Sequence, residues 1–246
     1  MALVIEDPAD LPERQRRNGH GDPIGLPLPG WTGAPRPVPV TLEGHVARAE
    51  PLDVRHAPAL HEAFARDTTG RLWTYMAHGP YPDASAFAAW VEKAAGQPDP
   101  LFFHLARRDG APVGIAALLR IQPEVGVIEI GSITLAPDAQ RSRAATEGLF
   151  LLMRHAMDEL RYRRLEWKCD ALNAPSRRAA LRLGFRFEGI FRNATIYKGR
   201  NRDTAWYAIT DDEWPACRHA LEAWLDDANF DADGRQRRRL AEFRQP

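Results

Sequence analysis

Residues 136–148, APDAQRSRAATEG, are the stretch that decides the fold. They follow an apolar run, VIEIGSITL (127–135), which has the composition of a strand. After them, Leu149, Met153, Met157 and Leu160 repeat at the spacing of one apolar helix face. The stretch therefore predicts a turn that leads from a strand into a well-defined helix.

Such a turn suits the binding of an anion. The first turn of a helix has unpaired backbone N–H groups and the positive end of the helix dipole, so it attracts phosphate. Ala144 and Ala145 let the backbone approach a ligand closely, and Arg141 and Arg143 can add charge-assisted hydrogen bonds. The stretch alone is equally consistent with small residues that begin a helix beside solvated arginines.

Other phosphate-binding and catalytic signatures are absent from the sequence. There is no GxxxxGK[ST] phosphate loop, no GxGxxG after a strand, no GxSxG and no HExxH. The eight histidines are scattered, so we expect no metal site. The anion-binding turn is therefore the strongest functional signal of the chain.

Periodicity outward from the turn predicts an α/β fold. We expect a strand near 41–50, helices over 53–66 and 84–96, and a hairpin over 101–121 that turns at Asp109–Gly110. A strand over 163–171, a helix closed by Gly184, and two strands over 185–210 follow the central helix. A last helix is expected over 211–228, capped by Asp211 or Asp212. The fold predicted is a mixed sheet, an antiparallel meander plus parallel crossover strands, flanked by helices.

The two ends of the chain differ in composition from the middle. Residues 1–40 are rich in proline and glycine, which predicts an extended N-terminal arm without regular helix or central strand. The arm either lies on the domain surface or reaches a second subunit, so a homodimer is left open. Residues 41–228 form the predicted domain, and residues 229–246 a charged, frayed C-terminal tail.

Composition narrows the partners and the compartment. The 33 basic residues balance the 33 acidic ones, which disfavours a nucleic-acid partner. Cys169 and Cys217 are far apart and form no CxxC, which favours a reducing, cytoplasmic location. No apolar run is long enough to span a bilayer, and the N-terminus is unlike a signal peptide, so no membrane association is expected.

Two stretches resemble the GNAT acyltransferase superfamily. QRSRAATEG (140–148) is similar to its QxxGxATEA elbow, and NAPSRRAALRLGFRFEG (173–189) is similar to its NxxSxxxxxxxGFxxEG signature. The nearest branch is the Rim-type N-terminal acetyltransferases, and the resemblance covers residues 41–212. It implies acetyl-CoA as cosubstrate, with its pyrophosphate on the elbow amides, and an amine as acceptor. Arg143 stands where the elbow usually has glycine, which puts cofactor affinity in question.

The resemblance also implies the site residues. The cofactor contacts it implies are Ile133, Thr134, Leu135, Gln140, Arg141, Arg143, Ala144, Ala145, Thr146, Asn173 and Ser176. Ser176 would protonate the departing thiolate, or else Asn173 and Ser176 only cap a helix. Glu129 is the first candidate for the base that accepts the amine proton, or else an exposed surface carboxylate. Thr195 stands where some Rim-type enzymes have glutamate, which weakens the transfer of a ribosomal-protein substrate to this chain.

The acceptor is not fixed by the sequence. An α-amine has a pKa near 8 and lysine near 10.4, so an α-amine is easier to use at neutral pH. Three functions stay open: acetylation of a protein N-terminus, acetylation of a small amino-acid-like or aminoacyl-nucleotide amine, and non-catalytic acyl-CoA sensing. The candidate pocket walls are Trp73, Tyr75, Tyr81, Trp167 and Trp206, and the candidate receptors for an acidic substrate are Arg192, Lys198 and Arg202.

Overall fold

The computed structural model describes residues 15–244. These residues divide into two compact units, and the boundary along the chain lies between Gly33 and Ala34. In the first unit, β1 (Gln15–Arg17) pairs antiparallel with β2 (Pro23–Gly25). The sequence predicts an extended arm here and does not predict this small hairpin. Residues 1–14 of that arm lie outside the described residues.

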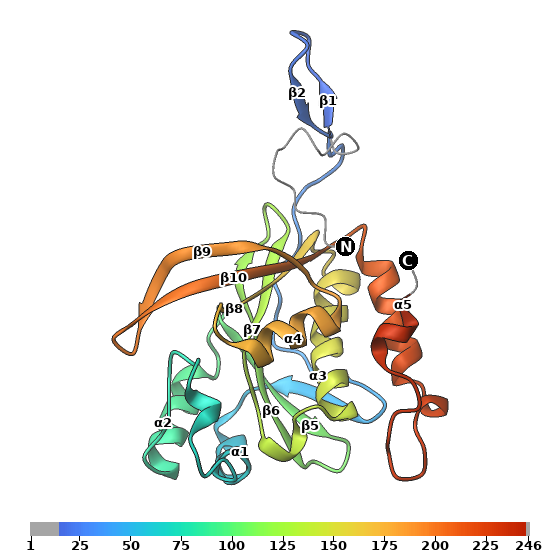
Figure 1. Cartoon of the computed structure of the whole chain (residues 1–246). Helices are drawn as coiled ribbons and strands as arrows, with labels where there is room; N and C mark the ends of the chain where they lie inside the picture. Colours follow the sequence, from blue (N-terminus) through green and yellow to red (C-terminus); the bar gives the residue numbers. More distant parts are fainter. Residues whose placement is uncertain (1–14, 245–246) are drawn as a thin grey trace. The chain divides into compact units, whose positions relative to one another are not determined.

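The second unit is built on an eight-stranded sheet with the order β3-β4-β5-β6-β7-β8-β10-β9 (Figure 1). Within residues 15–244, β7 and β8 are the only neighbouring strands of this sheet that pair in parallel, because the helix between them carries the chain back to the end of the sheet where β7 begins. The other neighbours are antiparallel. The strands are β3 (Leu42–Glu43), β4 (Ala47–Pro51), β5 (Leu101–Arg107), β6 (Pro112–Gln122), β7 (Val127–Leu135), β8 (Arg164–Asp170), β9 (Arg186–Tyr197) and β10 (Arg200–Thr210).

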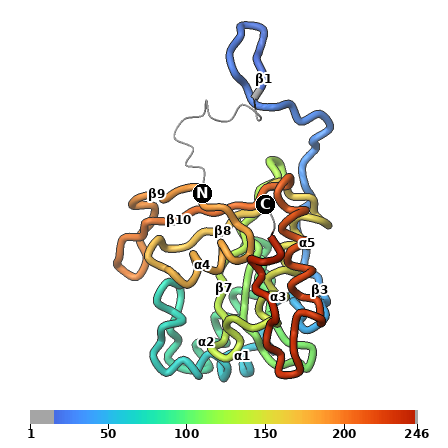
Figure 2. The backbone as a smooth tube through the Cα atoms, turned by 45° about the vertical axis from the view of Figure 1, so that its right-hand side comes forward, coloured from blue at the N-terminus to red at the C-terminus, as the bar shows by residue number. Residues whose placement is uncertain are grey.

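Five α-helices accompany the sheet: α1 (Ala57–Ala65), α2 (Ala84–Ala94), α3 (Arg143–Arg154), α4 (Ala174–Leu183) and α5 (Trp214–Leu225). Helix α3 continues as a π-helical turn, His155–Glu159. Helix α5 lies alongside α3, as the two backbone views show (Figures 1 and 2), and the ring centroids of Phe150 and Trp214 are 6.2 Å apart. The mixed α/β fold predicted from the sequence is confirmed.

Strand alternation separates the helices onto two faces of the sheet. On β5, Phe102 packs against Trp90 of α2 at 5.5 Å between ring centroids, while Leu105 contacts Gly148 of α3. Successive side chains of a strand point to opposite faces, and Phe102 and Leu105 are three residues apart. Helices α1 and α2 therefore cover one face, and α3 covers the other.

Two expectations at the C-terminal end are wrong. Neither Asp211 nor Asp212 caps α5: its N-cap is Glu213, which makes no side-chain cap and instead accepts the N–H of Thr210 at 2.9 Å. Residues 229–244 are also not frayed. Asn229 binds the backbone of Trp224 and Arg238, and Leu240 is 2% exposed against the core.

Within residues 15–244, no helix combines the length and the hydrophobicity needed to cross a membrane.

Candidate active site

The central feature of the site is a split in the sheet between β7 and β8. The two strands pair only from Val127 to Glu129 on β7 and from Arg164 to Glu166 on β8. Beyond these residues β7 stays paired with β6, while β8 stays paired with β10. The strands therefore diverge, and backbone groups that a continuous sheet would use face the opening.

A bulge on β7 lies inside the split. Gly131 pairs with Ala117 and Thr134 pairs with Ile115, so β7 has one residue more than β6 between these two pairs. Within the bulge, Ser132 has a φ of 49°. A bulge shifts the backbone N–H and C=O groups of a strand out of register with the neighbouring strand, so that they point in a new direction. The predicted main-chain contacts Ile133, Thr134 and Leu135 begin at this bulge.

The turn after β7 brings a helix N-terminus to the wide end of the split. Ser142 caps α3, and its hydroxyl accepts the N–H of Ala145 at 3.0 Å. Among residues 15–244, the N–H groups of Arg141, Arg143 and Ala144 donate no hydrogen bond. These three donors, with the helix dipole, form an anion site. The N–H of Ala145 is not free to bind a ligand, because it donates to the Ser142 hydroxyl.

The side chains of the elbow mostly support the fold. The Arg143 guanidinium binds Asp227 at 2.7 Å and the carbonyl of Leu225, and it lies 4.3 Å over the Phe230 ring. Its side chain is thus directed to the C-terminal segment, while its backbone N–H remains for a ligand. Gln140 donates to the carbonyl of Leu135 at 3.3 Å.

A second helix N-terminus, that of α4, follows β8 at the same end of the split. Asn173 caps it by accepting the Ser176 N–H at 3.1 Å. The Ser176 hydroxyl accepts the indole N–H of Trp167 at 2.9 Å. Because its oxygen accepts this bond, the hydroxyl proton of Ser176 is not used by Trp167. On the same face, Arg182 of α4 reaches Thr146 of α3 at 3.2 Å, so the two helices are neighbours.

A groove of about 1240 Å³ lies on the opposite face of the split. Glu129 pairs with Leu119, and Phe102 pairs with Ala117. Leu119 and Ala117 are two residues apart on β6 and so lie on one face of the sheet. Glu129 therefore lies on the same face as Phe102. Helices α3 and α4 therefore lie on one side of the split, and the groove lies on the other. The groove is lined by Arg120, Glu129, Lys168, Phe191, Arg192, Asn193, Ala194, Thr195, Arg202, Asp203, Thr204 and Trp206.

Glu129 is a buried carboxylate in this groove and not an exposed one. It is 5% exposed, and its Oε2 lies 3.1 Å from Lys168 Nζ and 3.5 Å from Arg120 Nε. Burial raises the pKa of Glu129 above its usual range, and the two cations offset this only in part. A carboxylate with a raised pKa is suited to accept a proton near neutral pH.

Glu166 and Trp206 complete the surroundings of Lys168. Glu166 Oε2 lies 2.6 Å from Lys168 Nζ, and the Trp206 ring centroid lies 3.8 Å from it. Burial would raise the pKa of Glu166, but hydrogen bonds from Lys168 and Arg164 lower it overall. The pKa values of the two neighbouring carboxylates are therefore shifted in opposite directions, that of Glu129 upward and that of Glu166 downward.

Of the predicted pocket walls, only Trp206 lines this groove. Trp73 and Tyr81 pack on each other with ring centroids 5.3 Å apart, and the Tyr75 hydroxyl donates to the carbonyl of Leu172. Trp167 is buried on the other face. Of the candidate receptors for an acidic group, Arg192 and Arg202 line the groove, while Lys198 donates to the carbonyl of Trp73 at 2.7 Å.

Sequence reasoning missed Ser142, Lys168 and Glu166. Ser142 carried a readable signal, since serine three residues before Ala145 is a preferred helix cap. The other two meet Glu129 through the parallel pairing of β7 with β8, which no local pattern specifies.

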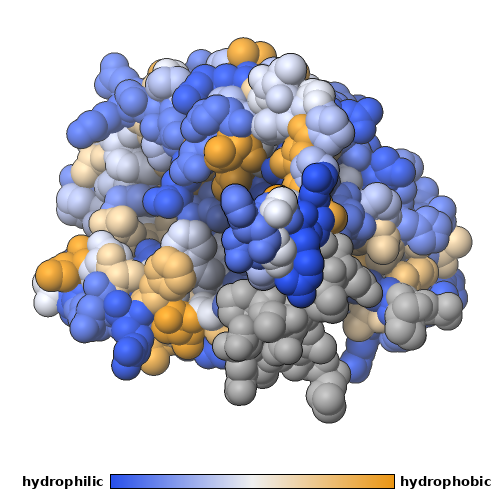
Figure 3. Space-filling model, turned by 90° about the horizontal axis from the view of Figure 1, so that it is seen from above, coloured by the Kyte–Doolittle hydropathy of each residue, from blue (hydrophilic) through white to orange (hydrophobic). Residues whose placement is uncertain are grey.

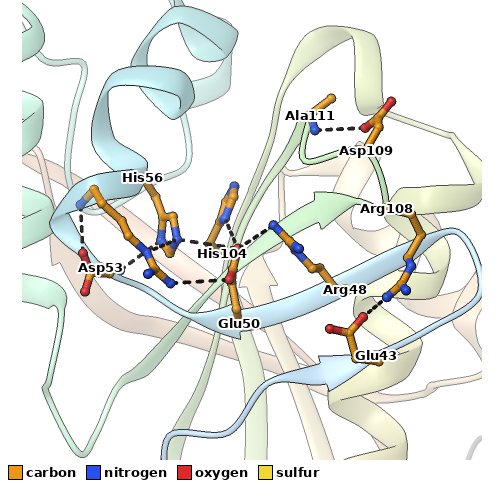
Figure 4. Close-up of polar contacts among 10 residues, drawn as sticks. Glu43, Arg48, Glu50, Asp53, His56, His104, Arg108, Asp109 and Ala111 are labelled. Atoms are coloured by element: carbon orange, nitrogen blue, oxygen red, sulfur yellow. Dashed lines mark hydrogen bonds and ion pairs between the residues drawn. The ribbon is translucent and has the colours of Figure 1, made fainter.

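A second buried polar cluster joins β4, β5 and the turn before α1 (Figure 4). Glu50 Oε1 lies 3.2 Å from His104 Nδ1 and 3.6 Å from His56 Nε2, and the two imidazole rings stack at 4.3 Å. Arg48 and Arg55 also lie 3.4 and 3.6 Å from this carboxylate. The three possible ligand atoms lie within 4.8 Å of one another, but the guanidinium groups already compensate the charge of Glu50.

This cluster predicts a stability that falls in acid. Burial, with the neighbouring His56, lowers the pKa of His104 to about 4. The unfolded chain therefore binds a proton near pH 6.5 that the folded chain does not, and stability is lost as pH falls from 6.5 toward 4. We expect a loss of at most about 2 kcal/mol from His104 between pH 6.5 and 5.

Urea unfolding at pH 7, 6 and 5 measures this effect. His104→Gln should flatten the dependence on pH, whereas His219→Gln, at an exposed position of α5, should leave it unchanged. An equally steep curve for His104→Gln would assign the acid sensitivity to other groups. His78, whose pKa burial also lowers to about 4, is the next candidate.

Comparison with known proteins gives the class of the chain. A family model of the GNAT acetyltransferase domain matches residues 48–186, which is more than half of the chain. The crystal structure of a GCN5-related N-acetyltransferase from Brucella melitensis is similar, with 46% identity and a TM-score of 0.86 over 88% of this chain and 99% of that one. The uncharacterized N-acetyltransferase YnaD of Bacillus subtilis (strain 168) is 28% identical over 141 residues, which cover 57% of this chain and 81% of YnaD.

A more distant structure shares the fold. Mycobacterium smegmatis RimJ in complex with CoA-disulfide has 23% identity and a TM-score of 0.64, over 75% of this chain and 94% of that one. Together these similarities define the chain as an acyltransferase. It belongs to the GNAT N-acetyltransferase family, whose cosubstrate is acetyl-CoA, as the elbow and the second signature predicted.

Proposed function

We propose that this protein transfers an acetyl group from acetyl-CoA to a primary α-amine, of either a protein N-terminus or an amino-acid-like small molecule. The observation that carries the proposal is the split between β7 and β8, with two helix N-termini on one face and the groove around Glu129 on the other. A thioester held at the helix side would present its acyl group to the groove through the split.

The cosubstrate would be held largely by backbone groups. The free N–H groups of Arg141, Arg143 and Ala144 would bind the pyrophosphate, with Thr146 beside them on α3. The diverging edge of β7, from Ile133 to Leu135, would bind the pantetheine arm, together with Asn173 and Ser176 at the start of α4. Gln140 would support this edge, since it donates to Leu135.

The reaction would proceed by direct attack. The amine nitrogen bonds to the thioester carbonyl carbon, the amine proton passes to Glu129, and the carbon–sulfur bond breaks. The thiolate that leaves would take the proton of Ser176, whose oxygen accepts a hydrogen bond from Trp167, and Ser176 would regain a proton from water. An α-amine suits this site, because its pKa near 8 leaves a usable unprotonated fraction at neutral pH.

Acetyl-CoA calorimetry, followed by thiol release with a panel of amines, tests the function. Binding and turnover with α-amines support it. Binding without turnover on any amine would favour an acyl-CoA sensor. Preference for a peptide beginning with the N-terminal sequence of a ribosomal protein, over free amino acids, would favour the Rim-type branch.

Ser176→Ala should lower kcat by about 10²-fold and leave the acetyl-CoA Kd within about twofold, if the hydroxyl acts as the acid. Ser85→Ala, on the exposed surface of α2, is the matched control and should change neither quantity. Equal loss of turnover and affinity would mean that Ser176 mainly supports the start of α4.

A further inference from the structure

We infer that the acceptor is a zwitterion at neutral pH: a primary amine that carries a carboxylate or a phosphate on the same molecule, next to a flat apolar group. The inference rests on the proposed function, because it takes the groove around Glu129 as the acceptor site. It goes beyond that function by naming what the rest of the acceptor must contain.

The charges in the groove do not balance. Lys168 is compensated by Glu129 and Glu166, and Arg120 lies 3.5 Å from Glu129. Within the described part of the chain, Arg192 and Arg202 have no carboxylate within 4.0 Å of their guanidinium nitrogens, the distance that defines an ion pair. Two positive charges thus line the groove without a carboxylate in ion-pair contact.

The one other carboxylate of the groove, Asp203, is turned toward backbone and amide donors. It accepts the N–H of Asn193 at 2.8 Å and the side-chain amide N–H of Asn201 at 3.1 Å, and these bonds, with a smaller effect of the Arg192 charge, lower its pKa. Asp203 therefore serves the β9–β10 pairing and leaves at least one guanidinium charge unopposed. Arg202 is oriented by a bond from its Nε to Thr204 at 3.1 Å, which leaves its terminal nitrogens available.

An aromatic wall stands beside these guanidinium groups. The rings of Phe191 and Trp206 lie 4.6 Å apart at 33°, and Phe191 is 57% exposed. Hydrophobic side chains are exposed among hydrophilic ones on the face of the molecule seen from above (Figure 3). An exposed ring next to unpaired guanidinium groups provides stacking surface and anion-binding donors in one place.

This arrangement selects against purely cationic acceptors. A protonated amine is attracted by Glu129 but repelled by Arg192 and Arg202, so a polyamine would gain little from the groove. An anionic group on the same molecule removes this repulsion and adds charge-assisted hydrogen bonds. Carboxylate and phosphate share this chemistry, and the experiment separates them.

Rates with matched pairs of acceptors test the inference. L-Phenylalanine is compared with L-phenylalaninamide, and O-phosphoethanolamine with ethanolamine, at fixed acetyl-CoA. We expect kcat/KM to be at least about tenfold higher for the anionic member of one pair or both, which is a difference of about 1.4 kcal/mol. The carboxylate pair and the phosphate pair report separately which anion the groove prefers.

Variants locate the preference in the groove. In the double variant Arg192→Gln/Arg202→Gln, the ratio of kcat/KM for the anionic member of a pair to that for the neutral member should fall toward one. The acetyl-CoA Kd should stay unchanged. Arg178→Gln, exposed on α4 outside the groove, is the matched control and should keep the ratio. Calorimetry with N-acetylphenylalanine and its amide gives a readout that does not depend on turnover, and the acid should bind at least about tenfold more tightly.

The outcomes distinguish the two proposals. Equal rates within both pairs and equal affinities for acid and amide overturn the inference, while turnover still supports the acetyltransferase. Retention of the ratio in the double variant also overturns it. If no amine is acetylated although acetyl-CoA binds, the proposed function is overturned. Selective binding of N-acetylphenylalanine over its amide would then still assign the anion site to the groove.

Discussion

Glu129→Gln should lower kcat by about 10²- to 10⁴-fold and leave the acetyl-CoA Kd unchanged, because an amide cannot accept the amine proton. The buried carboxyl has a raised pKa and lies at the floor of the groove. Since only its ionised form accepts a proton, activity should fall as pH drops through this pKa. The raised pKa places that acidic limb above the usual range of a glutamate, and the variant should lose the limb.

Glu166→Gln is the control for this experiment. It removes the same charge from the same cluster, next to the same lysine, but outside the residues that line the groove. We expect a loss of less than about tenfold, since Glu166 would take no proton from the amine. Equal losses in the two variants would show that the net charge around Lys168 matters, and that Glu129 is not the base.

Glu147→Ala should remove at least about 3 kcal/mol of the free energy of unfolding. Its carboxylate accepts the backbone N–H groups of His45, Val46 and Ala47 at 2.6–2.7 Å. Each buried donor left unsatisfied costs about 1–3 kcal/mol. Gly44 lies so close that a Cβ there would stand 2.6 Å from the Glu147 side chain.

Urea unfolding of the variant measures this effect. Glu147→Gln keeps one acceptor oxygen and should lose less than the alanine variant, while Glu92→Gln, exposed on α2, should lose nearly nothing. A midpoint for Glu147→Ala close to that of Glu92→Gln would mean that water replaces the three bonds. Glu147 in the elbow would then have no structural role that the loop before β4 depends on.

The fold could be predicted because its signals are local. The apolar runs of β5 to β7, the turn at Asp109–Gly110 and the apolar stripe of α3 each lie within a short window of sequence. The cap of α5 could not be predicted in this way. Acidic residues occur at three successive positions there, and the bond from the Thr210 N–H to Glu213 decides between them.

The geometry of the candidate site could be predicted only where it is made of backbone. The elbow and the start of α4 are visible in the sequence because small and capping residues occur there at fixed spacing. The surroundings of Glu129 are not, since Lys168 and Trp206 reach it through the pairing of three strands. The order of the C-terminal segment depends on single buried groups, such as Leu240, within a highly charged stretch.

The anchoring of Arg143 connects the proposed cosubstrate site to the C-terminal segment. The Arg143 side chain holds the first turn of α3 to Asp227 and Phe230. Truncation of the protein after residue 226 would remove Asp227 and Phe230, which hold the Arg143 side chain. The first turn of α3, more than eighty residues earlier in the sequence, would then be less firmly held. Affinity for the cosubstrate would then report on whether the last helix and its following segment are in place.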